Sequence, residues 1–169
     1  MKRILIVEDE PDIQELLCAY LQDAGYETET AGDGVEALDR FRAQAFDLVL
    51  LDVKQADSER HRALTGRENA QTLRTAAWLE AHGKPFWLRY VLVPGISDAE
   101  ADIRALGERL GGYKSVERVE LLPYHTLGVH NSEAMGLEYK LRDVRENTPE
   151  QLDRAAALLR EYFPTVVVN

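Results

Sequence analysis

The feature that most constrains the fold of this chain is a regular alternation of short apolar runs with segments of helical periodicity. Continuous apolar runs of strand length occur at residues 3–7 and 48–53, and both lead into acidic side chains. Such runs are typical of strands buried on both faces, as in parallel sheets. After the first run, a segment with apolar residues at helical spacing opens at Pro11 and stops at Gly25. The alternation predicts an α/β fold.

The same alternation continues to the end of the 169 residues without a linker or a repeat, which predicts a single domain over residues 1–169. The sheet is expected to be parallel, with helices on both faces or with a curl towards a partial barrel. The final TVVV, residues 165–168, predicts a sixth short strand.

Two helix starts are predicted from capping signatures. Ser97 and Glu100 have capping-box spacing, and Thr148 and Gln151 have it too, with Pro149 at the first helical position. Both signatures precede segments with apolar residues at helical spacing, so both predict the beginning of a helix.

The overall charge and the single cysteine exclude several classes of function. A net charge of -10 argues against a general nucleic-acid binder. The N-terminus does not resemble a signal peptide and no apolar run is long enough to cross a membrane, so a cytoplasmic protein is expected. Cys18 is the only cysteine in the sequence, which excludes an internal disulfide and a cysteine-based cluster within one chain. A monomer is expected, with an edge-mediated dimer as the alternative.

The segment ILIVEDEPDIQELLCAYLQDAGYETETAGDGVEAL, followed by DLVLLDV, closely resembles the receiver domains of bacterial response regulators over residues 1–53. The resemblance implies that Asp52 is a phosphoacceptor and that Glu8 and Asp9 help to hold Mg²⁺. In a flavodoxin-like sheet the carboxyl ends of the first and third strands are neighbours, where carboxylates and a phosphoryl group suit Mg²⁺. The sequence departs from the receiver pattern beyond Asp52, because the later Ser or Thr and Lys positions of that family are missing.

The segments LLDVKQADSERHRALTG, WLRYVLVPGISD and VERVELLPYHTLGVHNSEAMGLEYKL resemble the C-terminal half of pyruvate formate-lyase activating enzymes, in the radical S-adenosylmethionine superfamily. The resemblance implies that Asp52, Lys54, Arg89 and His125 are remnants of an S-adenosylmethionine site. Alternatively, Arg89 and His125 pair with nearby carboxylates. The cluster-binding cysteines of that family are missing, and Cys18 alone cannot replace three thiolates.

Together, the two resemblances indicate a hybrid of a receiver-like fragment, residues 1–53, and a βα-barrel fragment, residues 54–169. We expect a flavodoxin-like, doubly wound sheet in the order 2-1-3-4-5, with the sixth strand at or near the edge beside the fifth. The expected function is that of an engineered scaffold without turnover, which needs no cofactor and keeps a weak Mg²⁺ and phosphoacceptor pocket. The alternatives are phosphorelay signalling through Asp52, or an S-adenosylmethionine or anion-binding remnant without iron-sulfur chemistry.

Lys54 carries the sharpest expectation about this pocket. Side chains two positions apart on a strand share a face, so Lys54 is expected on the same side as Asp52, close to the acidic cluster. An ammonium group there would weaken Mg²⁺ binding by Glu8, Asp9 and Asp52. The alternative is that Lys54 extends into solvent and leaves the site unchanged.

Overall fold

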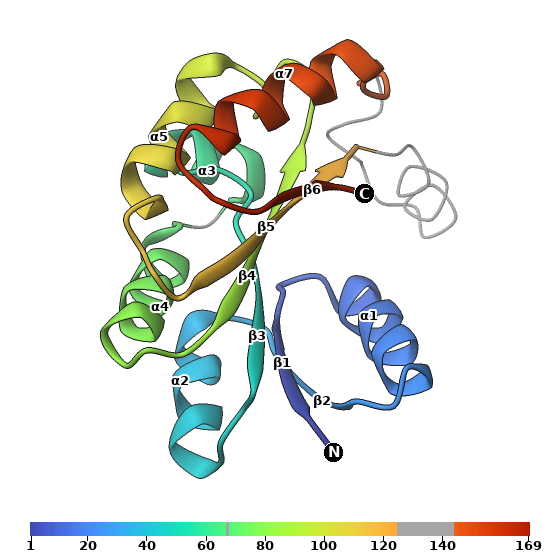
Figure 1. Ribbon diagram of the computed structural model, residues 1–169, viewed down its shortest axis with the longest axis vertical. Coiled ribbons are helices and arrows are strands. Elements are labelled where there is room, and N and C mark those ends of the chain that lie inside the picture. The colour runs from blue at the N-terminus through green and yellow to red at the C-terminus, as the bar shows by residue number, and fades with distance from the viewer. Residues whose placement is uncertain (67, 125–143) are drawn as a thin grey trace.

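The computed structural model describes residues 1–66, 68–124 and 144–169, which form one six-stranded parallel sheet (Figure 1). The order β2-β1-β3-β4-β5-β6 confirms the flavodoxin-like prediction, and the last strand pairs with β5 at the edge. The strands are β1 (Arg3–Val7), β2 (Glu27–Ala31), β3 (Leu48–Asp52), β4 (Phe86–Leu92), β5 (Val116–Pro123) and β6 (Val166–Val168).

The described helices are α1 (Pro11–Asp23), α2 (Gly34–Ala43), α3 (Ser58–Thr65), α4 (Ala70–Ala81), α5 (Glu100–Leu110) and α7 (Pro149–Arg160). The capping box of Thr148 and Gln151 is confirmed at the start of α7. The prediction from Ser97 is wrong, because α5 begins at Glu100 and its N-cap residue makes no side-chain cap. No helix in the described part of the chain is long and apolar enough to cross a membrane.

The two faces of the sheet are covered very unequally. Figure 1 shows α1 on one side of the sheet and α2, α4 and α5 on the other. The main core lies on the side with several helices and joins Leu5, Leu51, Leu88 and Leu121, one from each of four strands. On the opposite face, the packed side chains from a described helix all belong to α1. The sheet therefore has helices on both faces, as predicted, but most of its core on one.

The receiver-like region (residues 1–53) and the βα-barrel fragment (residues 54–169), called the enzyme-like region below, pack directly on each other across β3. Strand β3 pairs with β1 on one side and β4 on the other, so it lies inside the sheet. A side chain at Gly34 of α2 would clash with the Thr75 side chain and the Gln71 backbone of α4. This close approach requires a residue without a side chain at position 34 and places the two regions in one core.

Candidate functional site

The candidate site is a pocket of about 440 Å³ at the carboxyl ends of β1 and β3. Its lining includes Glu8 and Asp9 after β1, Gly34 at the start of α2, and Asp52 and Lys54 at the end of β3. The first turn of α4 completes the wall. Ligands bind at this edge of parallel α/β sheets, because loops from neighbouring strands open there.

The ammonium group of Lys54 lies inside the acidic cluster. Its Nζ is 2.7 Å from Asp9 Oδ1 and 2.5 Å from Glu10 Oε1. A third carboxyl oxygen, Oε1 of Glu8, is 3.4 Å away, and the Lys54 side chain is only 18% exposed. The prediction that Lys54 lies beside the acidic cluster is confirmed. Glu10 belongs to the same acidic run as Glu8 and Asp9 but was not among the predicted metal ligands.

The pKa values of these groups show how the cluster shares its charge. Burial, together with the neighbouring Asp52, raises the pKa of Glu8 to about 9. Burial alone would raise the pKa of Asp9, but the Lys54 ammonium holds it below its usual range. Burial also opposes the charge of Lys54, yet Glu8 and Glu10 hold its pKa above the ordinary value. At neutral pH the cluster therefore holds a protonated Glu8 and a charged Asp9–Lys54 pair.

Asp52 forms an ion pair with Arg89 on the neighbouring strand. The two residues are register partners, and Arg89 Nη1 donates a hydrogen bond of 2.9 Å to Asp52 Oδ1. On the other side of Arg89, its Nε is 3.8 Å from Glu120 Oε2 of β5. Glu120 could not be predicted from a local motif, because pairing across strands depends on the register. Arg89 was predicted either to be a remnant of an S-adenosylmethionine site or to pair with a nearby carboxylate. The structure shows the pairing with a carboxylate.

The predicted S-adenosylmethionine remnant is only partly described. Asp52 and Lys54 line one pocket, and Asp52 contacts Arg89, whereas His125 lies outside the described residues. Cys18 packs from α1 against the sheet. One thiol does not fit an iron-sulfur cluster that needs three cysteine ligands.

The carboxylates have the right chemistry for Mg²⁺, with one competitor. One oxygen each from Glu8, Asp9 and Glu10 lie within 4.8 Å of one another. The predicted ligand set was Glu8, Asp9 and Asp52, whereas this group contains Glu10 instead of Asp52. Oxygen ligands suit Mg²⁺, but the ammonium of Lys54 already contacts all three carboxyl groups. The metal assignment to Glu8, Asp9 and Asp52 stays a prediction.

Comparison with known proteins finds two similarities. The sequence model of the response regulator receiver domain matches residues 4–77, which extends past Asp52 into α4. The pyruvate formate-lyase-activating enzyme of Streptococcus mutans is 42% identical over 113 residues, 67% of this chain and 43% of that protein. Because the two matches together exceed the 169 residues of the chain, they overlap. The chain spans 43% of the length of the first curated relatives that it matches.

Solved structures show the same fold. A crystal structure of a domain of a pyruvate-formate lyase-activating enzyme from Bacteroides vulgatus aligns with a TM-score of 0.70 at 19% identity, over 100% of this chain and 99% of that chain. The signal receiver domain of a histidine kinase from Syntrophus aciditrophicus aligns with a TM-score of 0.51 at 22% identity, over 80% of this chain and 89% of that chain. The protein is thus a flavodoxin-like α/β domain. It combines a receiver-like N-terminal region with a region similar to an activating enzyme.

Proposed function

We propose that this protein is a folded hybrid scaffold without catalytic turnover, in which the acidic pocket of the receiver-like region is neutralised from within. The observation that carries the proposal is the ammonium of Lys54, which contacts Glu8, Asp9 and Glu10. Lys54 is the first residue of the fragment over residues 54–169, whereas the three carboxyl groups belong to the receiver-like fragment over residues 1–53. Charged groups of the two regions therefore neutralise each other.

We infer weak Mg²⁺ binding by Glu8, Asp9 and Asp52. Bound Mg²⁺ would neutralise charge on these carboxylates and on a transferred phosphoryl group. The Lys54 ammonium supplies one positive charge at that place, and the raised pKa of Glu8 removes one negative charge at neutral pH. Both effects lower the attraction of the pocket for a divalent cation.

We infer the absence of turnover from the single cysteine and from the functional residues that each region lacks. The sequence has one cysteine, which cannot hold an iron-sulfur cluster of three thiolate ligands. Each region also keeps only part of the residues that its resemblance implies. An engineered join of two βα fragments accounts for this combination, since both kinds of parent place their functional loops at the carboxyl ends of parallel strands.

Calorimetric Mg²⁺ titration of the protein and of Lys54→Met tests the proposal. Removing a charge that contacts the ligand set is expected to tighten Mg²⁺ binding by about tenfold or more, which corresponds to about 1.4 kcal/mol. Lys114→Met is the matched control, because Lys114 is exposed just before β5, at the opposite edge of the sheet. Equal affinities for the two variants, or weaker binding by Lys54→Met, would remove Lys54 from the site.

Phosphorylation of Asp52 is the second candidate function, because Asp52 lines the same pocket as Glu8 and Asp9. Intact mass after incubation with acetyl phosphate and Mg²⁺ tests it, with Asp52→Asn as the control. A gain of one phosphoryl group that is absent from Asp52→Asn would support signalling over an inert scaffold. Titration with S-adenosylmethionine in the same buffer tests the remnant binding site, and no saturable heat is expected from the scaffold.

A further inference from the structure

The Asp52 carboxylate is held inside the sheet by an arginine of the enzyme-like region. The Asp52 side chain is 8% exposed and that of Arg89 is 10% exposed. An arginine stays charged when buried, so it requires an anionic partner at hydrogen-bonding distance. The 2.9 Å bond to Asp52 Oδ1 supplies that partner, and the parallel register fixes the two residues opposite each other.

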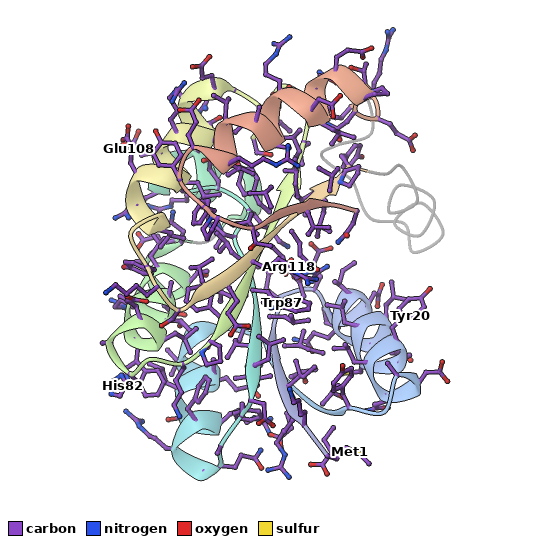
Figure 2. All side chains as sticks on the ribbon, in the orientation of Figure 1. Met1, Tyr20, His82, Trp87, Glu108 and Arg118 are labelled. Carbon is purple, nitrogen blue, oxygen red and sulfur yellow. The ribbon has the colours of Figure 1, made fainter. Side chains whose placement is uncertain are left out.

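A second carboxylate competes for the same guanidinium. Glu120 is the register partner of Arg89 on β5, and its Oε2 is 3.8 Å from Arg89 Nε. Glu120 is shared, because its other oxygen is 3.7 Å from Arg118 Nη1. The guanidinium of Arg118 in turn lies 4.0 Å over the ring of Trp87, and Figure 2 labels both side chains together near the middle of the sheet. Arg89 thus stands between a near acceptor, Asp52, and a more distant one.

We propose that Arg89 is an internal lock on Asp52, whose hydrogen bond weakens cation binding by this carboxylate and slows its attack on an electrophile, and that Glu120 sets how tightly the lock holds. This inference rests on the proposed hybrid scaffold, in which Asp52 is the inherited acceptor. A reagent that reacts at Oδ1 of Asp52 must first displace the guanidinium of Arg89. Such displacement is easier when Glu120 is available to receive Arg89.

The arrangement predicts opposite effects for two substitutions. Arg89→Met removes the cation, keeps a side chain of moderate length and frees Asp52 Oδ1. Glu120→Gln removes the competing charge, so that Arg89 is left with Asp52 as its nearby anionic partner among the described residues. Reactivity of Asp52 should therefore rise in the first variant and fall in the second.

Carboxyl labelling with a carbodiimide and glycine ethyl ester, in a buffer without Mg²⁺, measures this reactivity directly. Peptide mass spectrometry follows the rate at Asp52 relative to the exposed Glu15 in the same digest. In Arg89→Met we expect the relative labelling rate of Asp52 to rise about tenfold, which corresponds to about 1.4 kcal/mol. In Glu120→Gln we expect a labelling rate below that of the parent protein. Arg74→Met is the matched control, because Arg74 lines the pocket but has no ion pair within the described part of the chain.

The outcomes separate the lock from the proposed function. Equal labelling of Asp52 in the parent protein and in folded Arg89→Met would overturn the lock, as would faster labelling in Glu120→Gln. If circular dichroism shows that Arg89→Met does not fold, the slower labelling expected in Glu120→Gln decides the matter. A failed Mg²⁺ titration of Lys54→Met would count against the neutralised pocket without changing these rates, since labelling uses no metal.

Discussion

The two faces of the sheet hold the two regions together in different ways. The face covered by α2, α4, α5 and α7 buries one continuous apolar core that runs through β1, β3, β4 and β5. The face carrying α1 has a small apolar cluster and then a row of charged side chains formed by Asp52, Arg89 and Glu120. Apolar packing is tolerant of exchange when pattern and volume are kept, whereas ion pairs depend on the partner and its register. We infer that exchanged fragments join through the apolar face covered by α2, α4, α5 and α7. The face that carries α1, called the charged face below, is where the join changes the partners of functional side chains.

The strongest test of this comparison uses two neighbouring leucines of β3 that point to opposite faces. Leu51→Ala removes a buried side chain from the main core, and a loss of about 4 to 5 kcal/mol in unfolding free energy is expected from the cavity. Leu50→Ala affects the small cluster under α1, where several neighbours are only half-buried, and a loss of about 2 to 3 kcal/mol is expected.

Urea unfolding, followed by circular dichroism and by tryptophan fluorescence, measures both losses. One cooperative transition with both probes is expected, because the main core crosses the boundary between the two regions. Two separated transitions would show that the regions fold independently. Equal losses of unfolding free energy in Leu51→Ala and Leu50→Ala would show that the two faces stabilise the fold to the same extent.

The fold could be predicted from the sequence, because its signals are local and repeated. Strand-length apolar runs and helical spacing gave the element types, and the receiver resemblance gave the strand order. Local signals failed where a tertiary contact competes for the same group. Ser97 has the capping-box spacing of Thr148, but its buried hydroxyl accepts from the Val93 amide just after β4 and donates to the Val91 carbonyl near the end of β4. It is therefore committed to the turn, and α5 begins later.

The candidate site was predictable only in part, for a related reason. The approach of Lys54 to the acidic cluster follows from strand alternation and from the neighbouring positions of β1 and β3. The choice of Asp52 as the nearer partner of Arg89, with Glu120 behind it, depends on the registers of β3, β4 and β5. A register between distant strands is set by the whole sheet, so no short motif contains it.

The second prediction concerns the pH dependence of the charged face. The pKa of Glu8 is raised by burial to about 9, above its unfolded value of 4.5. The folded protein therefore binds one more proton than the unfolded chain between these values, and this contribution to stability is lost as the pH rises. From about pH 6 to about pH 8.5, the unfolding free energy should fall by up to about 1.4 kcal/mol per pH unit.

Glu8→Gln is the variant that isolates this effect, because glutamine keeps the shape and stays neutral. Its unfolding free energy should be nearly independent of pH over the same range in urea titrations. Leu50→Ala is the control, since it weakens the same face without removing a titrating group, and it should keep the slope of the parent protein. A parent slope near zero would mean that Glu8 is already ionised in the folded protein.

The smallest expected effect tests whether the charged face stabilises the fold at all away from Asp52. Arg118 is held by Trp87 and by Glu120, and its side chain is 36% exposed. A cation over an aromatic ring at such a site contributes about 0.5 to 1 kcal/mol, and a partly exposed ion pair adds little. Arg118→Met should therefore lower the unfolding free energy by about 0.5 to 1 kcal/mol.

The control for this prediction is Arg154→Met on an exposed position of α7, which should change the unfolding free energy by less than about 0.5 kcal/mol. A loss in Arg118→Met as large as that in Leu50→Ala would show that the charged face holds the two regions together as strongly as its apolar cluster does.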